Sequence, residues 1–570
     1  MNPALPLDDI NGTPLTLDQR RYLTGFFAGV AARGIRFDDV EPSPVDRGAA
    51  SPDDLIFEER VKRELHPLDA YPQLVENAAA NRAPDKEELF RFKWHGLFYL
   101  APGHDGFMAR LRIPGGFLNS FQLRELAAVA RELTSGYVQI TTRANLQMRL
   151  IEPKNAPAVL RRIQSVGLHT RGAGADNIRN ITANPTAGVD PLELIDVTLF
   201  CLELAQLIIN DRAFYNLPRK FNIAFDGGGL IGTVEDTNDI GVKAVAVGNE
   251  IHFRLAVGGA TGHKAFANDL GTQVRPSEVI QVIAALVRVF VANGNRTDRK
   301  RARLKHLLET WSLDQYLEET EKQLGRKLPR VPLDPAALAY PGQKRPHTHV
   351  GVYPQKQAGL NYVGVAVPVG QLTPKQMRRL AEIAELYGSG EVRLTVWQNL
   401  ILPNISDGFV ETVKKALRRI GFATETTPLR GGLVACTGNS FCKYAQANTK
   451  TTAQDIVTYL EKKLSLDQPI NIHLTGCPNS CAQHYMGDIG LLATKTRHGE
   501  GFHVFVGGGF GAHQAVGRQV FTGVSVGELP ATLERMLSAY LARRMASETF
   551  QQFTARHDLN GLQVMFTNGE

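Results

Sequence analysis

The stretch FMARLRIPGGFLNSFQLRELAAVARELTSGYVQITTRANLQMR, residues 107–149, recurs in the second half of the chain as NYVGVAVPVGQLTPKQMRRLAEIAELYGSGEVRLTVWQNLILP, residues 361–403. The copies align without a gap at an offset of 254, and 14 of their 43 positions are identical. Such a repeat indicates a duplicated structural unit. Each copy reads as strand, helix, strand, so a mixed α and β fold is expected. In the first copy the strands are expected at Met108–Ile113 and Tyr137–Thr142.

A helix is expected between the two strands of each copy. Asn119 and Gln122 fit a capping box in the first copy. Thr373 and Gln376 fit the same pattern in the second copy, where Pro374 takes the first helical position.

A second repeat follows the first. Residues 222–262 align with residues 471–511 at an offset of 249, so the chain is expected to be organised as A, B, A′, B′. Linkers are expected at 327–346 and 152–157. The expected boundaries are 1–85 for a helical N-terminal extension, 86–157 and 345–415 for the two A units, and 158–330 and 425–565 for the two B units.

The composition excludes several classes of protein. The 570 residues carry a net charge of +7 and are 43% hydrophobic, which is typical of a globular protein of several domains. No window approaches the roughly eighteen uninterrupted apolar residues of a membrane span. The segment Met1–Leu15 does not have the pattern of a signal peptide, so a cytoplasmic location is expected.

The two halves differ in their chemistry. Three arginines of the first half, Arg110, Arg112 and Arg143, align with Gly364, Ala366 and Trp397 of the second. The second half instead holds four of the five cysteines. The first half therefore supplies cations and the second thiols, and a pseudo-twofold arrangement would bring both sets to one central site.

The four cysteines are Cys436, Cys442, Cys477 and Cys481, in the pattern C-x5-C followed by C-x3-C. Four thiolates from two loops would enclose a soft metal centre. Structural zinc favours C-x2-4-C spacing, whereas iron–sulfur clusters accept more varied loops. The spacing favours an iron–sulfur cluster and leaves zinc or unligated thiols as alternatives. The fifth cysteine, Cys201, lies in an apolar run and is expected to be a buried small hydrophobe.

Several blocks of the chain together resemble one family. The segments Cys436-TGNSF-Cys442-KYA and TG-Cys477-PNS-Cys481-AQH look like the cluster motif of the assimilatory nitrite and sulfite reductases. The likeness extends to Arg110-LRIPGG, Thr141-TRANLQ, Asp176-NIRN and Leu217-PRKFN, in the family's order. It covers about residues 90–560.

The resemblance implies a duplicated fold of ferredoxin-like half-domains and two sirohaem and cluster domains. It also implies a 4Fe–4S cluster on all four cysteines, with Cys481 bridging to the iron of a sirohaem. The implied reaction is the six-electron reduction of nitrite to ammonia, or of sulfite to sulfide.

The resemblance further implies the residues of a cationic pocket. Because sirohaem carries eight carboxylates and the substrate is an anion, paired cations are needed to bury them. Expected substrate contacts are Arg110, Arg179, Lys220 and Asn222; expected sirohaem contacts are Thr141, Arg143, Gln147, Arg219 and Asn479. Arg112 shares the strand face of Arg110, and its role is left open.

The Asn222 position favours nitrite over sulfite. Sulfite reductases of the family typically carry lysine there, and one cation fewer suits the smaller charge of nitrite. Since no flavin or nicotinamide segment is visible, electrons are expected from ferredoxin, a small acidic partner, and the duplication makes a monomer plausible. The remaining alternatives are an assimilatory sulfite reductase, a monooxygenase similar to precorrin-3B synthase, and a zinc-stabilised binding protein.

Overall fold

The computed structural model describes residues 9–10, 13–14, 55–101, 104–333 and 349–568. The chain divides into two compact units, Met1–Asp54 and Leu55–Glu570. Within the first, the described residues form one antiparallel strand pair, β1 (Asp9–Ile10) and β2 (Thr13–Pro14). All that follows concerns the second unit.

The duplicated A units form two five-stranded sheets. The first has the order β15-β6-β7-β4-β3, and the second has the order β13-β14-β17-β16-β5. The strands of the first are β3 (Leu97–Tyr99), β4 (Phe107–Arg110), β6 (Val138–Ile140), β7 (Leu146–Ile151) and β15 (Gln371–Leu372). Those of the second are β13 (Gly351–Pro354), β14 (Leu360–Val365), β16 (Glu391–Leu394), β17 (Leu400–Ser406) and β5 (Phe117–Asn119).

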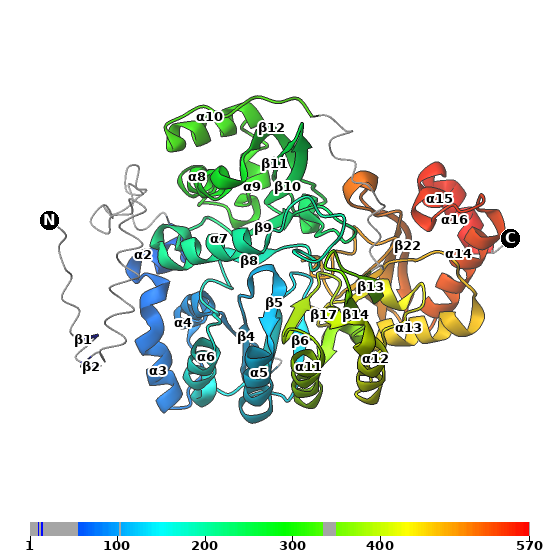
Figure 1. Cartoon of the computed structure of the whole chain (residues 1–570), viewed down its shortest axis with the longest axis horizontal. Coiled ribbons are helices and arrows are strands. Elements are labelled where there is room, and N and C mark those ends of the chain that lie inside the picture. Colours follow the sequence, from blue (N-terminus) through cyan, green and yellow to red (C-terminus); the bar gives the residue numbers. More distant parts are fainter. Residues whose placement is uncertain (1–8, 11–12, 15–54, 102–103, 334–348, 569–570) are drawn as a thin grey trace. The chain divides into compact units, whose positions relative to one another are not determined.

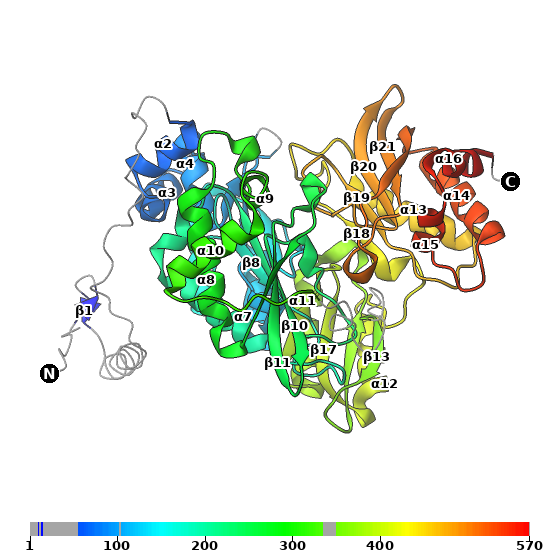
Figure 2. The ribbon, with the colours of Figure 1, turned by 90° about the horizontal axis from the view of Figure 1, so that it is seen from above.

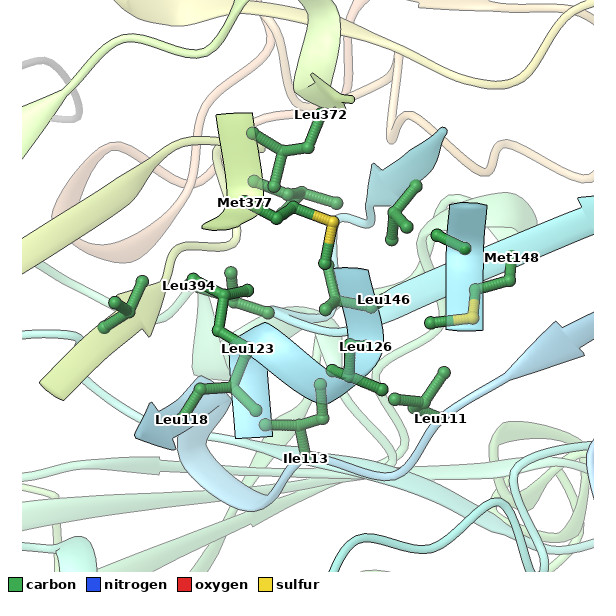
Figure 3. Close-up of a cluster of buried hydrophobic side chains, with 14 of the residues drawn as sticks. Leu111, Ile113, Leu118, Leu123, Leu126, Leu146, Met148, Leu372, Met377 and Leu394 are labelled. Carbon is green, nitrogen blue, oxygen red and sulfur yellow. The ribbon is translucent and has the colours of Figure 1, made fainter. Parts of the chain in front are cut away.

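The two A units exchange one strand. β5 belongs to the first copy but pairs with β16 of the second, while β15 of the second copy pairs with β6 of the first. The exchanged strands are equivalent at the repeat offset, so the exchange is reciprocal. Figure 3 shows the resulting shared core, in which Leu372 and Met377 of the second copy lie among Leu123, Leu126 and Leu146 of the first. Each A unit thus needs the other to complete its sheet and core.

The helices of the A units begin where the sequence predicts. α5 (Ser120–Leu133) is capped by Asn119 with Gln122, and α11 (Pro374–Tyr387) by Thr373 with Gln376. The two helices pack against each other and lie side by side in Figure 1. The first strand of the first copy ends earlier than expected, at Arg110, because Arg112 and Ile113 leave the sheet to contact the following domain.

The linker expected at 152–157 is wrong. That segment enters α6 (Ala156–Ser165), whose residues Val159, Leu160 and Ile163 pack into the core of the first A unit. Pro157 occupies one of the first two helical positions, where proline is tolerated because no intrahelical donor is lost. The equivalent helix of the second copy is α12 (Val410–Arg419). The other expected linker, 327–346, lies partly outside the described residues.

The B units repeat one topology. The first sheet has the order β12-β11-β10-β9-β8, and the second has the order β18-β19-β20-β21-β22. In each, the first three strands in sequence run parallel and the last two pairings are antiparallel. The first sheet comprises β8 (Ile178–Thr182), β9 (Phe221–Asp226), β10 (Ile240–Val247), β11 (Glu250–Val257) and β12 (Asn268–Val274). The second comprises β18 (Leu433–Ala435), β19 (Ile472–Thr475), β20 (Ile489–Thr496), β21 (Gly499–Val506) and β22 (Arg518–Ser525).

Helices cover both B sheets. The first packs with α7 (Thr198–Asn210), α8 (Val279–Asn293), α9 (Leu304–Leu307) and α10 (Leu313–Leu324). The second packs with α13 (Thr449–Lys463), α14 (Leu529–Arg543), α15 (Phe550–Arg556) and α16 (Leu559–Asn568), which Figure 2 shows gathered beside it. Among the described residues one helical segment, Pro276–Asn293, is long and apolar enough to cross a membrane. It is 61% buried inside the protein and forms part of the first B core.

Between Leu55 and the first A unit the chain is helical. α2 (Phe57–Glu64), α3 (Tyr71–Ala79) and α4 (Lys86–Arg91) follow one another there. The expected helical extension therefore exists from Phe57 onward, and nearly all of its earlier part lies outside the described residues. The duplicated mixed α and β fold is confirmed.

Candidate active site and metal centre

The two cysteine loops leave adjacent parallel strands. Ala435, the last residue of β18, pairs with Leu474 of β19, so both strands end at the same edge of the sheet. Cys436 follows β18 directly, and Cys477 comes two residues after β19. The sequence pattern thus becomes a spatial cluster because the topology of the sheet brings the two loops together.

The cysteine thiols are close enough to influence one another. Burial, together with the smaller effects of Cys481, Cys442 and Cys436, raises the pKa of the Cys477 thiol to about 11. Burial, followed by the charge of Cys481, also raises the pKa of Cys436. The Gly476 N–H opposes this rise by donating to Cys436 Sγ at 3.1 Å. Four thiols with backbone donors suit an iron–sulfur cluster, whose sulfurs accept such hydrogen bonds.

The four cysteine side chains do not form a ready-made site for one metal ion. Throughout the part of the chain that the structure describes, no three His, Cys, Asp or Glu side chains meet closely enough to hold a single metal ion. The four cysteines differ in exposure: Cys477 is buried, Cys436 and Cys442 are half-buried, and Cys481 is exposed. Cys481 is thus the most accessible of the four.

Two of the expected substrate cations lie together. Arg110 Nη1, at the end of β4, and Arg179 Nη1, on β8, both donate to the Ala173 carbonyl, at 3.2 and 3.1 Å. Arg179 Nε is buried and has no hydrogen-bond partner among the described residues. Burial, followed by the charge of Arg110, holds the pKa of Arg179 well below its usual range. A guanidinium with a free buried donor beside a second cation is prepared for an anion that both would share.

Lys220 joins this group from the residue before β9. It makes no hydrogen bond or ion pair with another described residue. Burial and the nearby Arg303 guanidinium lower the pKa of Lys220 to about 7, Arg179 and Arg219 act in the same direction, and the Cys481 thiolate opposes them. An anion bound between these groups would relieve the repulsion and favour the charged amine.

The first half also contacts the cysteine loop directly. Thr142 Oγ1 donates to the Cys481 carbonyl at 2.9 Å, next to Thr141, whose Oγ1 accepts from the Arg143 N–H at 3.2 Å. Burial lowers the pKa of Arg143 to about 10, with Asp239 and Cys481 opposing the shift. Arg143 and Cys481 therefore come from different halves of the duplication and lie within electrostatic reach of each other.

The charge balance fits a polycarboxylate group. Among the described residues, none of Arg110, Arg143, Arg179 and Lys220 forms an ion pair with a carboxylate. Burying four such cations without partners is costly, and a bound anion removes that cost. The residues present therefore fit a sirohaem: these four cations would hold its carboxylates, and Cys481 would lie on the side of the cysteine cluster nearest to it.

Two expected site residues are tied to buried acids. Arg219 Nη1 lies 3.7 Å from Asp176 Oδ1, a carboxylate that Arg299 also binds through both terminal nitrogens at 2.8 Å. The Asn222 N–H donates to Asp239 Oδ2 at 2.8 Å. Arg219 keeps a partly free guanidinium, whereas Asn222, the second residue of β9, is buried and its side-chain Nδ2 also donates to Asp239 Oδ2, at 3.4 Å.

Gln147 and Asn479 occupy different surroundings. Gln147 Oε1 accepts from Arg149 Nη2 at 2.6 Å, so Gln147 contacts another cation of the first half. Asn479 is exposed, between the last two cysteines. The structure therefore gives Gln147 a positioning contact and leaves the Asn479 side chain open to solvent.

Sequence reasoning missed several charged residues near the cysteines. Arg149, Lys450 and Arg303 all act electrostatically on the site. Arg149 aligns with Pro403 at the repeat offset, so the comparison that selected Arg143 would have found it. Lys450 has no such signal, because its position depends on how α13 packs.

Arg112, left open by the sequence, holds the structure together. It is 1% exposed and donates to the carbonyls of Arg171, Ile178 and Arg179 at 3.1, 2.7 and 2.8 Å. It thus fixes β8 against the first A unit and positions Arg179. His473 and His484 are also structural: both are buried, and burial lowers their pKa values to about 4 and about 3.

The cysteine loops and the cation pocket occur in segments that match known family models. The nitrite and sulphite reductase 4Fe-4S domain matches residues 174–328 and 430–560, and the nitrite/sulfite reductase ferredoxin-like half domain matches residues 101–166 and 353–420. The chain belongs to the nitrite and sulfite reductase family. Members of this family use sirohaem and a 4Fe–4S cluster, so the chain is an oxidoreductase built for these two groups.

Individual members of the nitrite and sulfite reductase family are similar to this chain over most of its length. A ferredoxin–nitrite reductase of Synechococcus elongatus is 39% identical over 78% of this chain and 88% of its own length. A ferredoxin-type sulfite reductase of Mycolicibacterium paratuberculosis is 34% identical over 84% and 90%. The solved structure of the Mycobacterium tuberculosis NirA protein is 32% identical, with a TM-score of 0.83, over 89% of this chain and 97% of that one.

Proposed function

We propose that this protein reduces nitrite to ammonia with electrons from ferredoxin. The observation that carries the choice of nitrite is Asn222, a buried neutral residue of β9 two positions after Lys220. Sulfite near neutral pH is partly a dianion, whereas nitrite is a monoanion, so a pocket with one cation fewer suits nitrite. The ferredoxin–nitrite reductases among the relatives support this choice.

The site residues have distinct proposed roles. When bound, the 4Fe–4S cluster would pass on the electrons of the donor protein, and sirohaem would supply the iron at which the anion is reduced. Arg110 and Arg179, which the Ala173 carbonyl holds side by side, bind and orient the anion. Arg143 and Arg219 hold carboxylates of the cofactor, and Thr141, Gln147 and Asn479 add polar contacts. The four cysteines hold the cluster, with Cys481 on the sirohaem side.

Lys220 has the properties of a proton donor. Forming ammonia and water consumes protons, and a lysine with a pKa of about 7 exchanges its proton readily near neutral pH. The arginines stay protonated and act as fixed positive charges. Lys220 is therefore assigned both anion binding and proton delivery.

The substrate assignment is tested by comparing kcat/KM for nitrite and sulfite with one reduced viologen donor. We expect a ratio above about ten for nitrite, equivalent to roughly 1.4 kcal/mol of transition-state preference. Asn222→Lys should lower that ratio about tenfold by adding a cation for the dianion. Asn222→Gln, which adds no charge, is the matched control and should keep the preference for nitrite.

An unchanged ratio in Asn222→Lys would contradict the role of this position. A wild-type ratio in favour of sulfite would instead establish the second candidate, an assimilatory sulfite reductase, which the sulfite reductase relative favours. That result would mean that Arg110, Arg179 and Lys220 suffice for the larger anion.

The proposal also covers the oligomeric state, location, electron donor and domain boundaries of the enzyme. We propose a monomer in the cytoplasm, with docking of an acidic ferredoxin favoured by the net charge of +7 and weakened by salt. We keep the domain boundaries 86–157, 158–330, 345–415 and 425–565 with one change: the first half-domain continues through α6 to Ser165.

A further inference from the structure

Two buried cations lie beside Cys436 and the loop that it begins. They are Lys450, at the start of α13, and Arg149, on β7. They are 7% and 4% exposed. Among the described residues neither forms an ion pair with a carboxylate, and every hydrogen-bond acceptor of both is a neutral oxygen. The positive charges of Lys450 and Arg149 are therefore available to interact with another buried anion.

Lys450 holds the strand that leads into the cluster. Its Nζ donates to the Ala435 carbonyl at 3.2 Å, one residue before Cys436, and to the Val369 carbonyl. The adjacent Thr449 Oγ1 donates to the Cys436 carbonyl at 2.7 Å and lies 3.7 Å from Cys436 Sγ. The N-terminus of the 15-residue helix α13 thus points at Cys436 and adds the positive end of its dipole.

Arg149 holds both ends of the first cysteine loop. Its Nη2 donates to Thr437 Oγ1 at 2.7 Å, one residue after Cys436. Its Nη1 lies 3.5 Å from the Phe441 carbonyl, one residue before Cys442. Cys436 and Cys442 are the negative groups that act on Arg149 together with Tyr137, and Cys436 is the one that acts on Lys450.

A positive charge beside a redox centre favours its reduced state. Adding an electron makes the cluster more negative, and in a water-excluded site the attraction between this charge and a fixed cation is weakly screened. Net charge and hydrogen bonds to the sulfurs set the reduction potentials of iron–sulfur clusters. Both influences act at Cys436. The Gly476 N–H donates a hydrogen bond to its sulfur, and two buried cations from different halves of the chain lie beside it.

We propose that Lys450 and Arg149 raise the reduction potential of the 4Fe–4S cluster and thereby set how readily it accepts electrons from the donor protein. They are positioning residues that act through the cluster and do not contact the reduced anion. The inference goes beyond the proposed function, because it holds whether nitrite or sulfite is the substrate.

The test is a potentiometric titration of the holoenzyme in the presence of redox mediators, followed by the electron paramagnetic resonance signal of the reduced cluster. In Lys450→Gln, which keeps a hydrogen-bond donor but removes the charge, the ratio of reduced to oxidised cluster at a fixed potential should fall about tenfold. For a one-electron couple this is a midpoint decrease of about 59 mV. Arg149→Gln should shift the midpoint in the same direction.

Two variants separate charge from packing. Lys450→Arg keeps the charge and should keep a midpoint near that of the wild type. Arg393→Gln is the control for the loss of a buried cation elsewhere: Arg393, on β16 of the other A unit, is 5% exposed, donates to the carbonyls of Pro185 and Ala187, and is paired with Glu391. Its loss should leave the midpoint unchanged.

Three results would overturn the proposal. The first is an intact cluster in Lys450→Gln and Arg149→Gln with the wild-type midpoint. The second is an equal shift in Arg393→Gln. The third is failure of both neutral variants to retain iron and acid-labile sulfide, which would show that the cations are needed for assembly and not for the potential.

Discussion

Replacing Cys481 by serine is expected to lower nitrite turnover at least about a thousandfold, a loss of roughly 4 kcal/mol of transition-state stabilisation. The Cys481 carbonyl is held by Thr142 of the first half, and its thiolate acts on Cys436 and Cys477 on one side. On the other side it acts on Arg143 and Lys220. Serine would keep the fold but would remove the sulfur where the cluster and the cation pocket meet.

The measurement for Cys481→Ser is nitrite-dependent oxidation of reduced viologen, together with iron, acid-labile sulfide and the visible spectrum of the purified protein. We expect the cluster content or the sirohaem absorption to change along with activity. Cys201→Ala is the matched control, since Cys201 is buried on α7 in the first B core, and its activity should remain within severalfold of wild type. Wild-type turnover in Cys481→Ser would contradict the metal centre described here.

Lys220→Gln is expected to lower kcat/KM for nitrite by about two to three orders of magnitude, as for the loss of one group that stabilises developing charge or transfers a proton. Arg303, Arg179 and Arg219 lower the pKa of Lys220, and Cys481 raises it. Lys220 is therefore a cation that can lose its proton near neutral pH, beside arginines that keep theirs. Glutamine would keep a donor for the anion but would lose both the charge and the transferable proton.

The pH dependence gives a second readout for Lys220. Burial and the nearby arginines lower the pKa of Lys220 to about 7. Without a bound anion, the amine therefore loses its proton as the pH rises through neutrality. Bound carboxylates and substrate shift this loss to higher pH. We therefore expect wild-type kcat/KM to fall on the alkaline side. Lys220→Arg should retain anion binding and flatten that limb, because arginine stays protonated. An unchanged alkaline limb in Lys220→Arg would exclude Lys220 as the titrating group.

The local elements of the A units were predictable because their signals are local. The capping boxes at Asn119 and Thr373 depend on residues three positions apart, and both helices begin as predicted. The linker expected at 152–157 is wrong because this short segment leads into a helix: Pro157 fits the first turn of α6. The exchange of β5 and β15 had no local signal, since it depends on pairing between distant segments.

Those site residues could be predicted that differ between the two copies of the repeat. The loss of Arg110 and Arg143 from the second copy pointed to a function that belongs to the first copy, and the same comparison applied to Arg149 would have extended the set. The closeness of Lys450 to Cys436 depends on the packing of α13 against β18, which no spacing in the sequence encodes. Likewise, the structural role of Arg112 became clear only from its three carbonyl partners.

The central claim is that one site, built from cations of the first half and thiolates of the second, carries nitrite through the full reduction. The most direct test is to count products and electrons: anaerobically purified protein is supplied with a limiting amount of nitrite and excess reduced ferredoxin or viologen. The account predicts one ammonium ion per nitrite and about six electrons consumed, because nitrogen passes from the +3 to the −3 state while held at one site. Release of a partly reduced nitrogen product with fewer electrons, or no reduction of nitrite by coloured, cluster-loaded protein, would contradict it.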